Sequence, residues 1–408
     1  MAKEFPLHHF KYHITQVFEV LKDVIENGTF ADRAIEKVMR KNKLWKVRER
    51  SFVADTSYDI IRNWRLLSTV SDINDTLTLK NCWTLFGCYL IYKNDVIPRD
   101  PHFKFCNEGK FVADFKKFSK VRKIRESYPD ELDELCCKEL GENLWEKVSH
   151  ALNQTPNAFL RVNTLKITIE ELKAQLAEQN IETEYLTWSP QALMLPFSRN
   201  VFRTEQFKAG LFEVQDSVSQ LVAPFLSATS GMRVVDACAG SGGKTLHLAT
   251  ILKNKGKIIA LDPNKIKLEE LKKRAKRAGI SIIEAKIIDT TKVIKRLHNT
   301  ADRLLLDVPC SGLGVLKRNP DAKWKTTTED INRVKQQQRD ILTRYSSICK
   351  PGGFMVYTTC SILPSEGEQQ IKWFTSENPK WEFVSEKRYS PDVYEGDGFY
   401  MALLKRRE

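Results

Sequence analysis

Two cysteines, Cys310 and Cys360, occupy similar settings in this chain. Cys310 ends the stretch LLLDVPC (304–310), and Cys360 ends the stretch VYTTC (356–360), so each follows a hydrophobic run and a short polar turn. A cysteine is most often a small buried hydrophobe, the interpretation that we apply to the other thiols at 82, 88, 106 and 349. A thiolate that a base or a neighbouring charge activates can instead bond covalently to an electron-poor carbon. Because both cysteines come just after a predicted strand, we expect them on one ligand-binding edge.

A glycine-rich stretch, DACAGSGGKT (236–245), follows one predicted strand and opens a predicted helix. Its glycines would let the backbone turn sharply and approach a ligand, while the start of the helix presents unpaired N–H groups. The stretch has neither the GxxxxGK(S/T) spacing of triphosphate sites nor the GxGxxG spacing of dinucleotide sites. A tight strand-to-helix connection without a ligand is the alternative. The residues expected to contact a cofactor here are Cys238, Ala239, Gly240, Ser241, Gly242, Gly243 and Lys244.

Four successive predicted strands each end in an aspartate, and these ends lie at one edge of the predicted sheet. The aspartates are Asp236, Asp262, Asp289 and Asp307. A single aspartate at a strand end is commonly a helix cap, but four in succession favour a ligand site. Asp262 comes 26 positions after Asp236, where a carboxylate can accept both hydroxyls of a ribose. A glycine turn with ribose and adenine acceptors, and without a phosphate-binding lysine motif, predicts S-adenosylmethionine as the cofactor.

The elements that must position these residues alternate regularly from Gly231 onward. Predicted strands such as MRVVDA, GKIIALD and ADRLLLD are separated by predicted helices such as PNKIKLEELKKRAKRAG. This alternation predicts an α/β fold with right-handed crossovers and a mostly parallel sheet. Ligands of such sheets bind beyond the carboxyl ends of the strands.

Two regions precede this series. Residues 10–141 repeat apolar side chains at three- and four-residue spacing, which predicts an all-helical domain. The next sixty residues or so, from Asn157, predict a small α+β module. We therefore expect domains at residues 1–145, 155–225 and 226–408. Within the module, Arg161 and Asn163 would lie on one side of a strand and could contact a phosphate or make internal contacts.

The amino-acid composition indicates which class of molecule the protein binds. The 408 residues include 65 Lys and Arg against 52 Asp and Glu, a formal charge of +13, which favours a polyanion such as nucleic acid. The basic stretches 115–125 and 267–279 are either RNA contacts or solvated helix faces. No signal peptide or membrane span is predicted, so we expect a soluble cytoplasmic monomer. The nine cysteines lack paired CxxC spacing, which predicts reduced thiols and no metal site.

One reaction uses all of these groups. Carbon 6 of cytosine is electron-poor, and a thiolate that adds there makes carbon 5 nucleophilic toward a methyl group. Loss of the carbon 5 proton and elimination of sulfur then restore the aromatic ring. The reaction needs an activated cysteine, a donor at the ring edge and a base. Asp307 can serve the ring edge if it is protonated or paired, and on these grounds either cysteine could attack.

The stretches DACAGSGGKT, LLLDVPCSGLGVLKRNPDAKW and VYTTCSILPSEGE resemble the signature motifs of the Nol/Nop/Sun family of RNA 5-methylcytosine methyltransferases. GLFEVQDSVSQL (210–221) and FLRVNTLK are similar to the family's preceding segments, so the resemblance covers about residues 155–408. It implies a class I, Rossmann-like methyltransferase with a mostly parallel seven-stranded sheet and an RRM-like module. It also implies that Cys360 is the nucleophile and that Cys310 assists product release. Residues 238–244, Asp262, Asp289 and Asp307 match the family's cofactor contacts.

Two positions depart from the family pattern. Ser241 stands where many members have proline, which should alter the rigidity of the loop more than its chemistry. Gly367 stands where asparagine is frequent, which affects a local turn after the second cysteine. Both cysteines are present, so we expect an active enzyme.

The helical stretch at residues 31–67 is similar to the NusB-like RNA-binding domain of bacterial 16S rRNA cytosine methyltransferases. This similarity implies 16S rRNA as the substrate, and single-stranded or loop RNA would most easily release its base into the site. The alternatives are a tRNA cytosine-5 methyltransferase and a non-catalytic RNA-binding ribosome assembly factor. A DNA cytosine or amino-group methyltransferase is disfavoured, because DVPC (307–310) is neither a PCQ nor a DPPY-type sequence.

Overall fold

The computed structural model describes residues 7–73, 76–195, 200–289 and 291–408. The chain divides into two compact units, which we describe one at a time. The first comprises Met1–Thr155 and Leu316–Thr328, and the second comprises Pro156–Val315 and Glu329–Glu408. Within the described ranges, no helix has both the length and the apolar character needed to cross a membrane.

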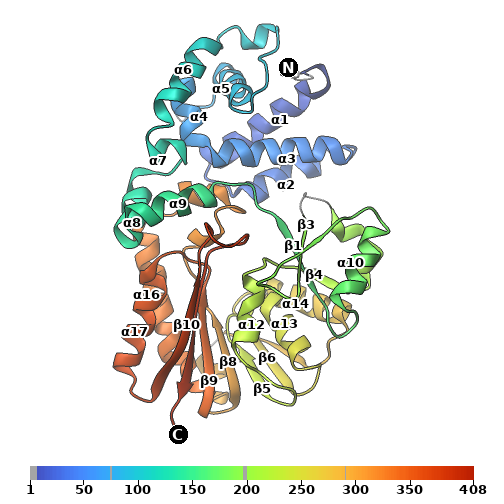
Figure 1. Ribbon diagram of the computed structural model, residues 1–408, viewed down its shortest axis with the longest axis vertical. Helices are drawn as coiled ribbons and strands as arrows, with labels where there is room; N and C mark the ends of the chain where they lie inside the picture. The colour runs from blue at the N-terminus through green and yellow to red at the C-terminus, as the bar shows by residue number, and fades with distance from the viewer. Residues whose placement is uncertain (1–6, 74–75, 196–199, 290) are drawn as a thin grey trace. The chain divides into compact units, whose positions relative to one another are not determined.

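The first unit is helical, as its apolar spacing predicts (Figure 1). Helices α1 to α6 enclose a core, in which Ile14, Ile60 and Phe86 are at most 1% exposed. Most residues of the aromatic helix α5 lie in this core. The elements are α1 (Leu7–Ile25), α2 (Ala31–Lys41), α3 (Val47–Arg62), α4 (Trp64–Ser71), α5 (Leu79–Tyr92), η1 (Pro101–Phe103), α6 (Glu108–Phe118), α7 (Arg122–Arg125), α8 (Asp130–Leu140), α9 (Glu142–Leu152) and η5 (Pro320–Trp324).

A segment from far along the chain completes this helical unit. Residues 316–328, which the expected boundaries assign to the third domain, pack with the helices. Lys323 is 1% exposed, and its Nζ donates to the carbonyls of Arg62 and Glu126 and to Asn153 Oδ1, at 3.2, 2.9 and 2.5 Å. Burial lowers the pKa of Lys323 well below its ordinary value, and these acceptors satisfy the N–H groups of the buried amine. The segment that follows the Cys310 motif is therefore an integral part of the helical unit.

The second unit begins with a four-stranded antiparallel sheet in the order β2-β3-β1-β4. A capping box between Thr168 and Glu171 starts helix α10, which buries Leu172 and Leu176 against this sheet. The predicted strand-and-helix module is therefore present. Its elements are β1 (Ala158–Val162), α10 (Ile169–Ala177), β2 (Glu184–Tyr185), β3 (Ala192–Leu195), η2 (Val201–Arg203), α11 (Glu205–Lys208) and β4 (Phe212–Val214).

A seven-stranded sheet in the order β10-β11-β9-β8-β5-β6-β7 forms the rest of the unit. Strands β5 to β9 pair in parallel, and β11 pairs antiparallel with both β9 and β10. The mostly parallel seven-stranded sheet is thus confirmed. The strands are β5 (Arg233–Asp236), β6 (Lys257–Asp262), β7 (Ile283–Ile287), β8 (Ala301–Asp307), β9 (Cys349–Thr359), β10 (Trp381–Tyr389) and β11 (Phe399–Arg406).

Helices cover both faces of this sheet (Figure 1). Leu304 and Leu306 of β8 pack on the face covered by α15 (Thr291–Arg296), α16 (Thr328–Tyr345) and α17 (Glu368–Glu377). Leu305 between them packs on the face covered by α12 (Val222–Phe225), α13 (Gly243–Ile251) and α14 (Lys265–Ala278), because successive side chains of a strand alternate. The connections leave β5 and β8 toward opposite faces. A ligand crevice is therefore expected outside the carboxyl ends of these two strands.

Candidate active site

The glycine loop between β5 and α13 has the backbone that its sequence predicts. Gly240 and Gly242 adopt φ values of +54° and +90°, which residues with side chains rarely adopt. A Cβ at Gly242 would lie 2.6 Å from Leu271 Cγ, so α14 packs directly against the loop. A Cβ at Gly240 would meet no atom within 4 Å. The backbone at Gly240 therefore borders open space, as a cofactor-binding turn requires.

The remaining members of the loop have different environments. Ala239 N donates to Leu261 O at 2.9 Å, and Ser241 O accepts from Arg274 Nη1 at 2.8 Å. The bond to Arg274 restrains the loop at the position where many relatives have proline. Burial raises the pKa of the Cys238 thiol well above its ordinary value, so this cysteine is neutral. Gly243 begins α13.

Asp262 ends β6 and Asp289 lies two residues beyond the end of the neighbouring strand β7, and the two differ in exposure. Asp262 is 7% exposed, and its two oxygens accept the N–H groups of Gly240 and Asn264 at 2.9 and 2.8 Å. Each carboxylate oxygen retains a lone pair that a ribose hydroxyl could use. Asp289 is exposed and, with Ile288, lines a cavity of about 720 Å³ whose other residues come from α15, the end of α16 and the segments that directly follow these two helices.

Asp236, at the end of β5, is buried, and one of its two carboxyl oxygens has no hydrogen bond within the described ranges. Its Oδ2 accepts from Thr245 Oγ1 at 2.7 Å, and its Oδ1 has no partner within the described part of the chain. Burial raises the pKa of Asp236 to about 7, although the bond from Thr245 acts in the opposite direction. An unpaired buried oxygen beside the glycine loop fits a site that receives a polar ligand.

The raised pKa of Asp236 predicts a pH-dependent stability. The folded protein binds this proton more tightly than the unfolded chain, in which the pKa of Asp236 is near 3.8. The proton's contribution to the free energy of unfolding is therefore fully present below about pH 4 and is lost as the pH rises toward 7. Asp236→Asn removes the titration. Between pH 5 and pH 8, the wild type should therefore lose up to ~3 kcal/mol of unfolding free energy relative to Asp236→Asn, as measured by urea unfolding. Asp289→Asn, at an exposed strand end, serves as the control, and a parallel change in both variants would contradict the assignment.

The two cysteine loops meet beyond β8 and β9. These strands are parallel neighbours, and Asp307 is in register with Thr358. Cys310 Sγ lies 3.2 Å from Cys360 Sγ. The hydrogen bond to Cys360, together with burial, raises the pKa of Cys310 well above its ordinary value. A protonated Cys310 can donate a hydrogen bond to the sulfur of Cys360.

A cation lies beside this pair. Lys244 Nζ is 2.7 Å from Asp307 Oδ2, and its side chain is 12% exposed. Burial acts to lower the pKa of Lys244, but attraction to Asp307, the hydrogen bond between them and attraction to Cys360 outweigh it and raise the pKa. Lys244 is therefore charged and can stabilise an anion at Cys360. It also provides the pairing that Asp307 needs to act at a ring edge.

A buried carboxylate that sequence reasoning missed links the two loops. Glu366 is fully buried and accepts from Ser311 N at 2.8 Å, Ser311 Oγ at 2.5 Å and Ser361 Oγ at 2.7 Å. Gln338 Nε2 of α16 donates to it at 2.9 Å. Because these serines directly follow the two cysteines, Glu366 holds both loops through one side chain. The repeated Cys-Ser pair, with SEGE shortly after the second, is the signal that could have identified it.

Gly314 allows the loops to pack closely. Its N–H donates to Cys360 O at 2.9 Å, and its carbonyl accepts from Gly398 N at 2.8 Å. A Cβ at this position would lie 2.1 Å from Gly398 O. Only glycine fits between the backbone at Cys360 and the backbone at Gly398.

Arg161 and Asn163 make internal contacts rather than presenting a phosphate site. Arg161 is 2% exposed and donates to Gly243 O at 2.5 Å and to Gln215. Asn163 Nδ2 donates to Gly210 O and Ala278 O, at 2.8 and 3.0 Å. Of the two interpretations drawn from the sequence, the structure supports the internal contacts. Through Arg161, the small sheet supports the first turn of α13.

Comparisons with known proteins show the family of the chain. The family model described as 16S rRNA methyltransferase RsmB/F matches residues 223–405, and a model for the ferredoxin-like domain of RsmF/B-like methyltransferases matches residues 128–201. The chain is 30% identical over 440 residues to a probable ribosomal RNA small subunit methyltransferase B of Synechocystis sp., covering 95% of this chain and 98% of the relative. The crystal structure of PH0851 superposes with a TM-score of 0.82 at 26% identity, covering 100% of both chains. A methyltransferase homologue from Pyrococcus horikoshii superposes with a TM-score of 0.62 at 27% identity, covering 70% of this chain and 97% of that one.

Proposed function

This chain belongs to the 16S rRNA methyltransferase RsmB/F family and is an RNA methyltransferase that uses S-adenosylmethionine. We propose that it methylates carbon 5 of a cytosine in small-subunit rRNA. The observation that carries the proposal is the 3.2 Å separation between Cys310 Sγ and Cys360 Sγ at the end of β8 and β9. Methyl transfer to an oxygen or an exocyclic amine has no use for two adjacent thiols, whereas carbon 5 of cytosine needs a covalent nucleophile.

The residues present fit the cofactor. It would supply an electrophilic methyl group, and the chain supplies the contacts. Asp262 keeps lone pairs for ribose hydroxyls, Gly240 leaves open space above the loop, and Asp236 has a buried oxygen with no partner in the described ranges. Asp289 is exposed at the next strand end, where we expect it to accept from the adenine.

Each residue near the two thiols has a distinct task. The Cys360 thiolate, next to the Lys244 cation, adds to carbon 6 of cytosine, so that a sulfur–carbon bond forms and carbon 5 gains nucleophilic character. The paired Asp307 and Lys244 hold the ring edge as charge develops there. Once Cys360 is bonded to carbon 6, its sulfur no longer carries the charge that keeps Cys310 protonated, so Cys310 can release its proton to solvent and, after methyl transfer, take the carbon 5 proton. The bond between carbon 6 and sulfur breaks, and Cys360 returns as a thiolate.

The proposal is tested by incubating the protein with labelled S-adenosylmethionine and either 16S rRNA or tRNA, followed by nucleoside analysis. We expect label in 5-methylcytidine from 16S rRNA. Label only in tRNA would identify the tRNA enzyme instead, and label in no cytosine of either RNA would favour an assembly factor. Sequencing of the methylated cytosines would then locate the position.

A further inference from the structure

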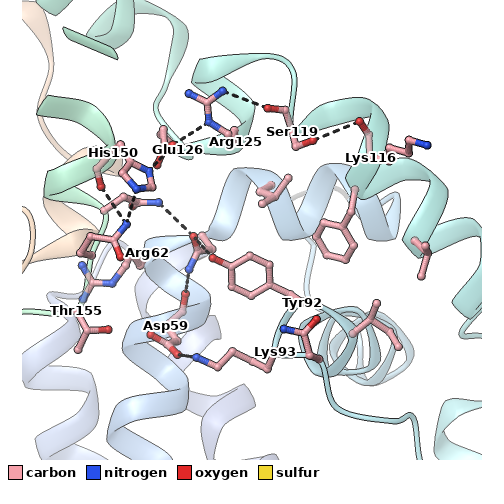
Figure 2. Close-up of a pocket in the computed structure, with 18 residues that line it drawn as sticks. Asp59, Arg62, Tyr92, Lys93, Lys116, Ser119, Arg125, Glu126, His150 and Thr155 are labelled. Atoms are coloured by element: carbon pink, nitrogen blue, oxygen red, sulfur yellow. Dashed lines mark hydrogen bonds and ion pairs between the residues drawn. The ribbon is translucent and has the colours of Figure 1, made fainter. Parts of the chain in front are cut away.

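The helical unit contains a cavity of about 640 Å³ that the methyl-transfer residues do not line (Figure 2). Its volume lies within the range of about 300–1,000 Å³ that is typical of small-ligand sites. The lining includes four basic side chains and two acidic ones. The basic ones are Arg62, Lys93, Lys116 and Arg125, and the acidic ones are Asp59 and Glu126. Tyr92, Phe115, Asn63, His150, Asn153 and Gln154 supply rings and polar groups.

The carboxylates do not neutralise all of the cations. Lys93 Nζ lies 3.0 Å from Asp59, and Arg125 Nε lies 2.8 Å from Glu126. His150 Nδ1 also contacts Glu126, at 3.0 Å. These contacts leave Arg62 and Lys116 without a carboxylate partner among the described residues. The cavity therefore has an excess of positive charge.

Arg62 gives the strongest indication of a ligand. It is 4% exposed, and only its Nη2 has a hydrogen bond in the described part of the chain, to Lys317 O at 2.8 Å. Its Nε and Nη1 are buried and have no partner among the residues that the structure describes. An unsatisfied buried guanidinium costs free energy, and an anion that entered the cavity would remove that cost. Lys323, which donates to the carbonyls of Arg62 and Glu126, holds the same wall in place.

We propose that this cavity binds a phosphate-bearing nucleotide of the single-stranded RNA substrate, outside the methyl-transfer site. Arg62 and Lys116 would pair with the phosphate, since guanidinium and ammonium groups are its usual partners. Tyr92 and Phe115, whose ring centroids are 5.9 Å apart, offer an aromatic surface on which a base can stack. In Figure 2, Tyr92 lies centrally among the lining residues. The inference rests on the proposed RNA substrate and adds a second point at which the enzyme holds it.

The test measures binding of a fluorescein-labelled single-stranded RNA to the full chain by fluorescence anisotropy, without the cofactor. We expect Lys116→Glu and Arg62→Gln to weaken binding by about tenfold or more, which is the effect of losing a charge-assisted hydrogen bond. For each lost phosphate contact, the slope of log affinity against log salt should fall by about 0.7. Thermal melting shows whether each variant is folded, and Lys116, which is exposed, keeps the test decisive if Arg62→Gln unfolds.

Lys117→Glu is the matched control, because Lys117 is the exposed neighbour of Lys116 on α6 and does not line the cavity. Both changes alter the net charge equally, so equal weakening by the two would overturn the proposal. Inorganic phosphate and a dinucleotide then compete with the labelled RNA. The dinucleotide should compete at far lower concentration, and equal competition would reduce the cavity to an anion site. Because binding is measured without methyl transfer, failure of the cytosine assay would leave this result intact.

Discussion

Replacement of Cys360 by alanine is expected to abolish cytosine methylation, whereas replacement of Cys310 by alanine is expected to trap a covalent protein–RNA adduct. The hydrogen bond to Cys360 and burial raise the pKa of Cys310, so Cys310 holds the proton while Cys360 is the sulfur next to Lys244. Without Cys360, no bond to carbon 6 forms. Without Cys310, that bond forms but the carbon 5 proton is not removed, so sulfur cannot leave.

The adduct is measured as labelled RNA that migrates with the protein on a denaturing gel in the presence of S-adenosylmethionine. Loss of either catalytic group commonly costs several orders of magnitude in rate, so we expect methylation by Cys360→Ala to fall by about 10⁴-fold or more. Cys349→Ala is the control, because burial raises the pKa of Cys349 to about 12 and makes it inert. An adduct in Cys360→Ala and none in Cys310→Ala would reverse the two roles.

The fold was predictable because its signals are local. Strands of the large sheet alternate with helices, and each strand ends at a residue that the sequence marks, such as Asp262 or Asp307. Parallel pairing then brings those ends to one edge without further information. The candidate site was predictable to the same extent, since Cys310 and Cys360 follow two strands that turn out to be neighbours.

The contacts that sequence did not predict join distant parts of the chain. Lys323 belongs to a stretch that reads as part of the catalytic domain, yet its buried Nζ bonds to Asn153, 170 positions earlier. Nothing in its neighbours distinguishes it from a solvated lysine. Glu366 was hidden for a similar reason, because its partners Ser311 and Gln338 come from separate segments. Buried polar groups satisfy one another through tertiary structure, and local periodicity carries no record of those pairings.

Glu366→Gln is expected to reduce the rate of methylation by about a hundredfold, because misplacement of a reacting group by about 1 Å has an effect of that size. Glu366 accepts four hydrogen bonds, three of them from the serines that follow Cys310 and Cys360. Glutamine has one acceptor oxygen, and its NH₂ group would face donors. With that group at the position of Oε2, the loop that carries Cys310 would lose the bond from Ser311 N, and Gln338 would lose its acceptor.

The effect of Glu366→Gln on positioning is separated from an effect on folding by measuring adduct formation in the Cys310→Ala background, well below the melting temperature. The proposal expects slow adduct formation with unchanged affinity for S-adenosylmethionine, because Glu366 contacts neither the glycine loop nor Asp262. Glu377→Gln, an exposed change at the end of the helix α17 that follows Glu366, should leave the rate unchanged. Normal adduct formation by a Glu366→Gln protein with a lowered melting temperature would make Glu366 a purely structural residue. The two serines, rather than the carboxylate, would then have to orient the thiols.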